Sequence, residues 1–179
     1  MRDLSLHILD IVQNSVAANA TKIEIWIKED MANDLLEITI KDNGKGMSQD
    51  ELTKVIDPFY TSRTTRKVGL GIPLFKANAE LCDGKFQIDS RLGIGTEVFA
   101  SFQHSHIDRV PLGDIIGTII SILAVNPETE LLLKIDSDGH LFTFDTEEIK
   151  VTLEDVPINT PLVLDWIKLY LTENIVLRG

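Results

Sequence analysis

Apolar positions near the start of the chain recur with the period of a helix. Leu4, Ile8 and Ile11 lie at this spacing within residues 3–19, which predicts a first helix. Asn19 suits the left-handed backbone position that ends such a helix. The chain is therefore expected to begin with an amphipathic helix whose apolar side covers a core.

Strict alternation of apolar and polar residues comes next. Residues 22–28 and 36–41 alternate in this way and are separated by a short polar turn, which predicts an antiparallel hairpin. Ser48, with Glu51 three residues later, forms the capping-box pattern that opens a short helix over 48–55.

The pattern then changes twice more. Residues 57–70 have no regular period, residues 71–82 predict a helix, and 85–90 and 96–102 predict two strands. Strands that share the chain with separate helices favour layered packing. We expect an α+β fold in which helices cover one face of a sheet, as in an α/β sandwich.

A second part begins near residues 104–111, where Pro111 disfavours helix in the residue before it. The pattern beyond it predicts an apolar helix over 112–125, a hairpin over 129–136 and 140–145, and helices over 146–152 and 160–173. We therefore expect two domains, one over 1–104 and a small acidic α+β domain over 105–179. The second would serve as a module for a partner or for a dimer.

Charge narrows the class of protein. Over 179 residues, 17 Lys and Arg oppose 28 Asp and Glu, which gives a formal net charge of −11. Residues 1–104 carry 12 basic and 15 acidic residues, whereas 105–179 carry 5 and 13. This excess argues against binding duplex DNA by phosphate neutralisation, and no nucleic-acid partner is expected.

Composition also bears on the compartment. The longest apolar run, residues 115–125, is too short to cross a bilayer, and the first residues lack the order of a secretion signal. Cys82 is the single cysteine, which excludes a disulfide framework within the chain. We expect a reduced cytoplasmic protein that does not contact a membrane.

Three polar residues share one side of the first predicted helix. His7, Asp10 and Asn14 are three and then four residues apart, so they form a stripe. Taken alone, such a stripe is more typical of a solvent-facing side, and the functional alternative is the wall of a cleft. In a cleft, Asn14 offers a neutral oxygen suited to Mg²⁺, and Asp10 can orient or deprotonate a water.

Glycines and an acid follow the second predicted strand. Asp42, Gly44 and Gly46 lie where the chain passes from a strand to a helix. Glycines let the backbone approach a flat ligand closely, and the carboxylate of Asp42 can accept a hydrogen bond from an exocyclic amine. A second glycine-rich turn, residues 93–96, is explained equally well as an ordinary hairpin turn.

Residues 57–71 form the largest basic cluster of this acidic chain. Hydroxyl groups, cations and glycines precede a helix start, a combination that attracts phosphate, although a mobile loop with solvated charges is the alternative. The candidate ligand-contacting residues in this stretch are Phe59, Thr61, Ser62, Arg63, Lys67, Gly69, Leu70 and Gly71.

The order of these motifs resembles the GHKL superfamily of DNA gyrase, the ninety-kilodalton heat-shock chaperone, histidine kinases and MutL. The matching motifs are Asp10-x-x-x-Asn14 for the N box, Asp42-x-Gly44-x-Gly46 for the G1 box, Asp57 to Arg63 for the F box, Gly69-x-Gly71 for the G2 box and Gly93 to Thr96 for the last box. The resemblance covers residues 1–104 and is closest to the ATP-binding domain of histidine kinases, with MutL-like residues after the N box.

The resemblance implies a two-layer α/β sandwich with a mixed, mostly antiparallel sheet, and it implies ATP and Mg²⁺ as ligands. Asn14 would help to hold Mg²⁺, Asp42 would accept the adenine amine, and Thr96 would support the adenine pocket. Gly44 and Gly46 would pass close to the base.

The resemblance also implies a lid over residues 57–70, with Gly69 and Gly71 on the phosphates. Asp10 stands where MutL-like ATPases have a catalytic Glu, so it is the candidate catalytic residue. Lys67 and Val68 stand where kinases often have Gly and a small polar residue, and Lys67 itself can contact a phosphate.

Three classes of function remain open at this point. The chain could be an ATP-dependent kinase acting in trans on an unidentified partner, a slow ATPase that switches partner affinity, or an ATP-binding docking module. The segment from Ser105 to Leu112 resembles a phosphoacceptor box, which makes His106 a hypothetical acceptor, with a polar linker as the alternative. We favour phosphotransfer to a partner protein, and a homodimer is compatible with the acidic second part.

Overall fold

The fold was analysed in a computed structural model that describes residues 2–59 and 70–179. The helices are α1 (Leu4–Ala17), α2 (Gln49–Ile56), α3 (Gly71–Leu81), α4 (Ile115–Val125), α5 (Thr146–Leu153) and α6 (Pro161–Asn174). The strands are β1 (Lys22–Asp30), β2 (Leu35–Asp42), β3 (Phe86–Arg91), β4 (Gly95–Gln103), β5 (Glu130–Ser137) and β6 (His140–Asp145).

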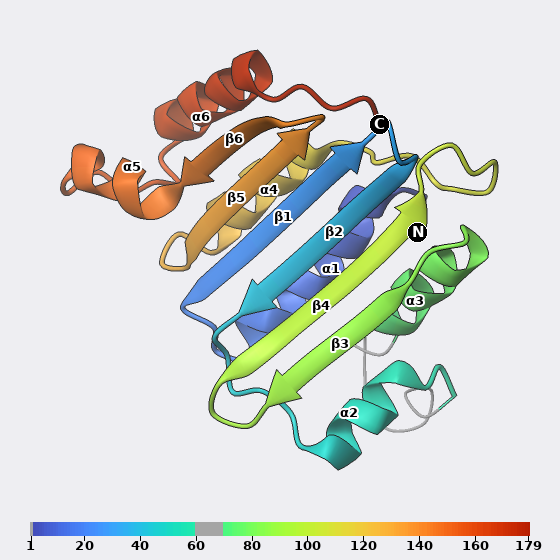
Figure 1. Ribbon diagram of the computed structural model, residues 1–179. Helices are drawn as coiled ribbons and strands as arrows, with labels where there is room; N and C mark the ends of the chain where they lie inside the picture. The colour runs from blue at the N-terminus through green and yellow to red at the C-terminus, as the bar shows by residue number, and fades with distance from the viewer. Residues whose placement is uncertain (1, 60–69) are drawn as a thin grey trace.

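The strands form a six-stranded sheet in the order β3-β4-β2-β1-β5-β6. Neighbouring strands of this sheet are antiparallel except β1 and β5, which are parallel. Helices α1, α3 and α4 cover one face, and the opposite face of the central strands is uncovered (Figure 1). The expected two-layer sandwich with a mixed, mostly antiparallel sheet is confirmed.

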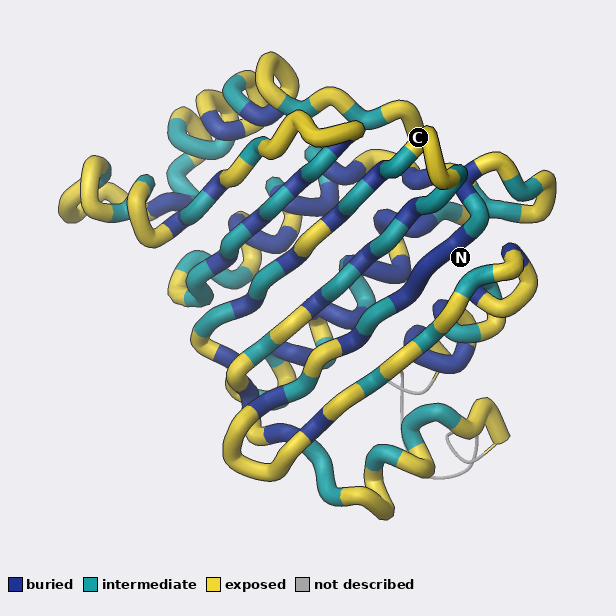
Figure 2. Tube along the Cα trace, in the orientation of Figure 1, coloured by how far each residue is buried: buried dark blue, intermediate teal, exposed yellow. Residues whose placement is uncertain are grey.

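Local sequence signals account for the first elements. Ile23, Ile25 and Ile27 are buried on the helix side of β1, as the alternation predicts, and buried and more exposed positions alternate along the strands (Figure 2). The hydroxyl of Ser48 accepts a hydrogen bond from the amide of Glu51, and the Glu51 carboxylate accepts one from the amide of Ser48. The predicted capping box is therefore confirmed at the start of α2.

The predicted helix over 112–125 starts later than the sequence suggests. It begins at Ile115, because Asp114 is the residue whose side chain caps it by accepting from the amide of Gly117. The carbonyls of Pro111 and Leu112 instead accept hydrogen bonds from the first amides of α1. This stretch therefore closes the start of α1 rather than extending α4.

Residues 105–179 add two strands to the same sheet. β5 pairs with β1 from the Lys22–Glu130 pair to the Glu29–Ser137 pair, and α4 packs against α1. One continuous hydrophobic core joins the two parts of the chain. The expected boundary near residue 104 thus falls between strands of one sheet, and the division into two domains stays a prediction.

A buried acid ties distant segments together at the far end of β1. The Glu29 carboxylate accepts hydrogen bonds from the Ser137 hydroxyl at 3.2 Å and from the Arg178 amide at 2.9 Å. Its other oxygen lies 3.2 Å from Nε2 of His104. These contacts hold β5, the residue after β4 and the C-terminal segment against β1. They also give both carboxylate oxygens of this fully buried acid a polar partner.

A helix that crosses a bilayer needs about 20 predominantly apolar residues. Of the helices in the described residues, none is both long enough and apolar enough to cross a membrane.

Candidate functional site

Asp42 lies at the end of β2 with its carboxylate held by three donors. Its Oδ2 accepts a hydrogen bond from the Ser15 hydroxyl of α1 at 2.6 Å. Its Oδ1 accepts from the amides of Gly44 at 2.9 Å and Thr96 at 3.3 Å. A carboxylate has about four acceptor positions, so this fixed group keeps room for one further donor. The arrangement suits a carboxylate that accepts a hydrogen bond from an exocyclic amine.

Thr96 lies beside Asp42 because β4 pairs with β2 in the Asp42–Thr96 register. The Thr96 hydroxyl is 2.8 Å from the hydroxyl of Ser90, which also accepts a hydrogen bond from the Met47 amide at 2.8 Å. The hydroxyl groups of Ser90 and Thr96 therefore connect β3, β4 and the segment that contains Met47. The structure brings Asp42 and Thr96 together, as the resemblance implies.

The glycines after β2 let the chain pack closely against itself. A side chain at Gly44 would meet the backbone oxygen of Ala18 at 2.9 Å. Gly46 has a φ of +69° and lies directly against the backbone oxygen of Arg91. The sequence predicts that these glycines admit a flat ligand, and that role stays a prediction. The close approach that the structure contains is made by the protein's own backbone.

Asp10 points at the first residue of α3. A Cβ atom at Gly71 would overlap Oδ2 of Asp10, so only glycine allows this approach. The Asp10 carboxylate is half-buried and accepts no hydrogen bond from the described residues. Its burial raises the pKa of the carboxyl group above the usual range, because desolvation disfavours the charged form. A carboxylate of this kind suits a proton acceptor.

Asn14 follows Asp10 by one helical turn. Its side chain is half-buried, and it makes no hydrogen bond with the residues that the structure describes. Groups of three or more His, Cys, Asp or Glu that could hold a metal ion are absent from the described ranges. A hard cation here would therefore depend on the Asn14 amide oxygen and on ligand oxygens.

The stretch between α2 and α3 is described only at its ends. Phe59 is exposed, and Leu70 precedes α3 without a side-chain capping bond. Gly71 begins α3, whose first amides point out of the helix. The other candidates of this stretch lie outside the described residues: Thr61, Ser62, Arg63, Lys67 and Gly69.

His7 lies in the core, not on a polar stripe. It is fully buried, its ring stacks on Phe75 with centroids 5.4 Å apart, and its Nε2 is 2.9 Å from Nδ2 of Asn78 on α3. Because the Asn78 amide donates, the imidazole proton lies on Nδ1, which has no partner among the described residues. The sequence predicts that α1 presents His7, Asp10 and Asn14 on one polar side. In the structure His7 faces the core, and only Asp10 and Asn14 border the site.

Burial gives His7 a measurable effect on acid stability. Desolvation lowers the pKa of His7 from 6.5 to about 4. Between these two pH values the imidazole is protonated in the unfolded chain but neutral in the folded chain, so acid favours unfolding. We expect the free energy of unfolding to fall by roughly 3 kcal/mol across this window on account of His7. Urea unfolding at pH 7 and pH 4.5 measures it. His7→Gln, which does not titrate, is expected to lose less stability, and an equal loss in both proteins would refute this origin.

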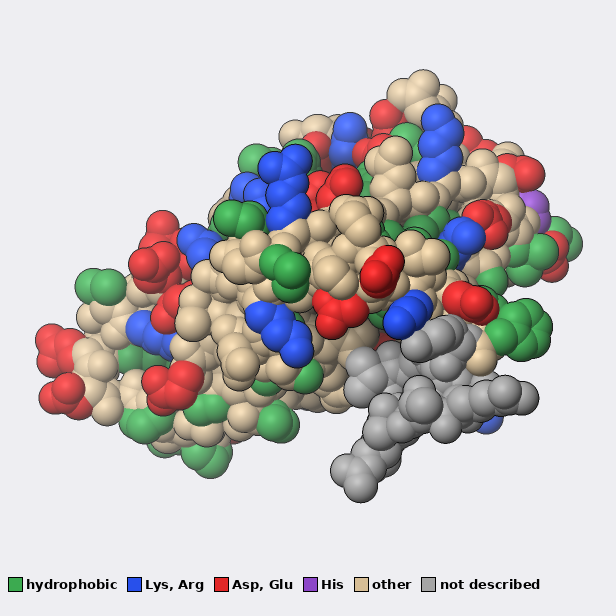
Figure 3. Space-filling view, turned by 90° about the horizontal axis from the view of Figure 1, so that it is seen from below, with side chains coloured by type: hydrophobic (Ala, Val, Ile, Leu, Met, Phe, Trp, Pro, Cys, Tyr) green, Lys and Arg blue, Asp and Glu red, His purple; other side chains and the backbone are tan. Residues whose placement is uncertain are grey.

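A cleft of about 760 Å³ opens at the same end of the sheet. Figure 3 shows this end of the molecule, where acidic and basic side chains are interspersed. Asp42 and Thr96 border the cleft, but Glu24, Lys41 and Glu97 line it from the uncovered face. Asp10 and Asn14 lie on the helix side. The predicted site residues therefore border the sheet end from the side of α1 and α3.

Two residues of this network were not among the sequence candidates. Ser15 fixes Asp42, and Ser90 links Met47 to Thr96. Ser15 falls on the apolar side of the first predicted helix, and a polar residue in such a position signals a buried partner. Ser90 likewise falls on the apolar face of its strand, in line with Phe86 and Ile88, so the same signal could have identified it.

Residues 2–106 match the family model described as "Histidine kinase-, DNA gyrase B-, and HSP90-like ATPase". The match covers more than half of the chain, and the chain belongs to this family. The resemblance to the GHKL superfamily is thereby confirmed, as is its closeness to the histidine kinases.

Curated relatives and solved structures agree with this assignment. The sensor histidine kinase YvrG of Bacillus subtilis is 29% identical over 98 residues, which are 52% of this chain and 17% of that protein. The histidine protein kinase DivJ of Caulobacter vibrioides is 31% identical over 101 residues, 54% of this chain and 17% of that protein. The chain thus spans about a sixth of the length of these relatives.

The fold also matches a solved structure titled as the Aquifex aeolicus MutL ATPase domain complexed with ADP. The TM-score is 0.56 at 19% identity, over 86% of this chain and 70% of that one. The aligned 86% is longer than residues 1–104, so the similarity in fold extends into the part of the chain that carries β5 and β6.

Proposed function

We propose that this protein binds ATP with Mg²⁺ and transfers the γ-phosphate to a partner protein in trans. The observation that carries ATP binding is the Asp42 carboxylate, which three donors fix while one acceptor position stays available. The end of β2 and the start of β4 hold the base in this proposal. The start of α3 and the residues before it face the phosphates, since helix N-termini favour anions.

Asn14 is the residue of α1 that suits Mg²⁺. Its amide oxygen is a hard, neutral ligand, and the side chain is not engaged by the described residues. A Mg²⁺ ion held there would offset the negative charge that develops on the transferred phosphate. Asn14 and Asp10 are about 6 Å apart along the helix axis, so both can serve one phosphate group.

The position of His106 argues for transfer between molecules. Strand β4 (Gly95–Gln103) separates it from the site, and the eight residue steps of this strand span about 26 Å at 3.3 Å per residue. Its Nδ1 accepts the Asp108 amide at 3.1 Å, and its Nε2 is 3.5 Å from the Asp83 carboxylate. We therefore propose an acceptor on another chain. The γ-phosphorus bond to its bridging oxygen breaks, a bond to the acceptor nitrogen or oxygen forms, the acceptor proton is released and ADP leaves.

Hydrolysis is a second candidate, and Asp10 favours it. Its half-buried carboxylate has a raised pKa and faces the start of α3. A base of this kind can take a proton from water that attacks the γ-phosphate. The protein would then act as a slow ATPase whose nucleotide state changes its affinity for a partner.

An experiment with γ-labelled ATP separates the two candidates. The purified chain is incubated with Mg²⁺ and a lysate fraction, and label on protein is resolved from free phosphate. Label on a second protein supports transfer in trans. Free phosphate alone supports hydrolysis, and the absence of both from a protein that binds ATP would refute both and leave the docking module.

The Asp10→Asn protein is expected to lose phosphate release by about 100-fold or more while ATP affinity stays within a factor of two. It is also expected to melt at a higher temperature at pH 7. The raised pKa means that the ionised carboxylate destabilises the folded state above that pKa, and the amide removes this cost.

Calorimetric ATP binding, phosphate release and thermal melting measure these effects. Asp155→Asn, a matched change at an exposed acid, should leave all three unchanged. Full phosphate release by Asp10→Asn would remove Asp10 from the proposed chemistry.

A further inference from the structure

Helix α6 carries apolar residues on two opposite sides. Ile167 and Leu171 are fully buried against the core. On the other side, Leu162, Trp166 and Leu169 are 79%, 51% and 57% exposed. Spacings of four and three residues place these three on one face, which we call the outer stripe. A helix that is apolar on both sides is expected to have a partner on each.

The outer stripe is ordered before any partner arrives. The Trp166 ring stacks on the Tyr170 ring with centroids 5.4 Å apart and an angle of 7°. Tyr170 in turn contacts the Phe142 ring of β6 at 5.9 Å. Stacked aromatic side chains lose little conformational entropy on binding, and Trp is the residue type most enriched at interface centres. These properties distinguish the stripe from scattered exposed leucines.

We propose that the outer stripe binds the α6 helix of a second copy of this chain, antiparallel about a two-fold axis near Trp166. Leu162 lies four residues before Trp166 and Leu169 three residues after it. Reversing the helix about Trp166 therefore brings Leu162 of one copy opposite Leu169 of the other, within one residue, or about 1.5 Å. The contact is made twice, as an isologous interface requires.

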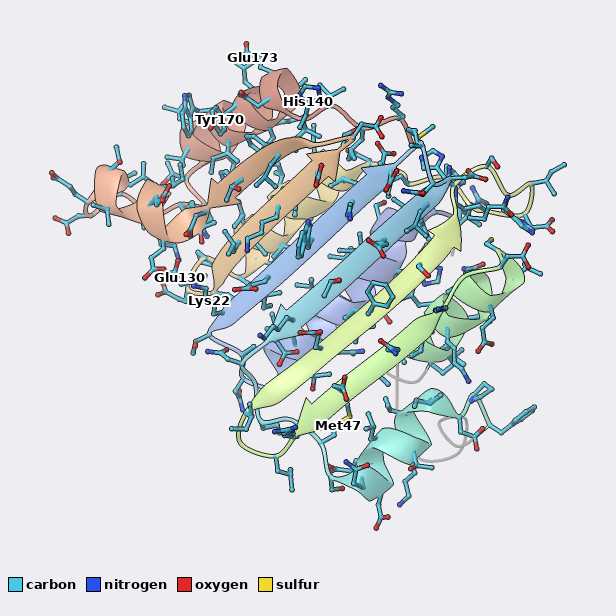
Figure 4. All side chains as sticks on the ribbon, viewed as in Figure 1. Lys22, Met47, Glu130, His140, Tyr170 and Glu173 are labelled. Carbon is cyan, nitrogen blue, oxygen red and sulfur yellow. The ribbon has the colours of Figure 1, made fainter. Side chains whose placement is uncertain are left out.

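The charges of α6 fit the same arrangement. Glu173 lies four residues beyond Leu169, so it continues the stripe, and Figure 4 shows it pointing away from the molecule. In the antiparallel pair it reaches the start of the other copy's α6. That start, at Thr160, has no side-chain capping bond. A carboxylate placed at the positive end of a helix is stabilising, and the pair contains this contact twice.

A second copy fits better than a basic partner because the complementarity lies within α6 itself. The Glu173 carboxylate and the uncapped start of α6 supply the two halves of each contact. The net charge of −11 repels two copies at long range, but salt screens charges beyond about 8 Å at physiological ionic strength. Contacts at the helix surface are shorter than that distance, so the contacts between the two α6 helices determine whether the copies associate.

Sedimentation equilibrium of the full chain at about 1–300 µM tests the proposal by mass action. We expect a concentration-dependent dimer in 150 mM salt. Leu169→Glu puts a charge into the stripe and should raise the dimer Kd about tenfold or more. Glu173→Lys should raise it about threefold or more, because the new cation faces the positive helix end.

Controls separate this interface from folding and from the nucleotide site. Ile107→Glu places the same charge at a residue that is 94% exposed and outside α6, and it should leave the dimer unchanged. Circular dichroism and ATP affinity of all variants should match the parent. A monomer at every concentration would overturn the proposal. So would a dimer that both α6 variants leave intact, or a stripe that binds only a different protein.

Discussion

The Asp42→Asn protein is expected to bind ATP about 100-fold or more weakly than the parent. One carboxylate oxygen becomes an amide donor, and the remaining oxygen already accepts from Gly44 and Thr96. The adenine amine then loses its charged acceptor, and a buried polar group left without a partner is costly. Isothermal calorimetry with a non-hydrolysable ATP analogue and Mg²⁺ measures the affinity.

The Ser15 contact requires a control for folding in this experiment. Asp42 accepts the Ser15 hydroxyl, so its replacement can also loosen α1 from the sheet. Thermal melting of each protein shows whether a lost affinity accompanies a lost fold. Glu97→Gln, an exposed change next to Thr96 on β4, should bind ATP as the parent does. An Asp42→Asn protein that is folded and keeps its affinity would remove the basis for this site.

A fragment of residues 1–104 is expected to lose cooperative folding. Without the rest of the chain, β1 loses all eight residue pairs with β5 and α1 loses its packing against α4. Of the 30 buried apolar residues in the described core, 12 lie after residue 105. Removing more than a third of the core is a loss larger than the few kcal/mol by which domains are stable. Urea unfolding followed by circular dichroism measures the transition.

A shorter deletion serves as the matched control for this fragment. A chain that ends at residue 174 loses the Arg178 amide that bonds Glu29, but keeps both added strands. It should unfold cooperatively with reduced stability. If the 1–104 fragment itself unfolds cooperatively and binds ATP, then residues 1–104 form a domain of their own, as the sequence predicts.

Local elements were predictable because their signals are local. The alternation of Ile23, Ile25 and Ile27 defines the buried face of β1, and the Ser48–Glu51 pair marks the start of α2. The turn at residues 138 and 139 likewise locates the hairpin of β5 and β6. Each of these features depends on residues only a few positions apart.

The arrangement of distant parts could not be predicted in the same way. Parallel strands are not connected by a short turn, so the sequence carries no local signal for the pairing of β1 with β5. The hydrophobic pattern therefore does not reveal that residues 105–179 extend the first sheet. The helical stripe does not reveal that His7 is buried, because its burial depends on Phe75 and Asn78 of α3. The residues that hold Asp42 in place are likewise set by tertiary contacts.

The β1–β5 pairing also has a consequence for how the protein is made. β1 ends at residue 30 and its partner strand begins at residue 130, so about a hundred residues are synthesised between them. At about 5–20 residues per second, β1 keeps an open edge on the ribosome for roughly 5–20 s. An open edge rich in isoleucine is a template for wrong pairing. Slow synthesis of this stretch should therefore lower the yield of native protein, and a chaperone that shields strand edges should restore it.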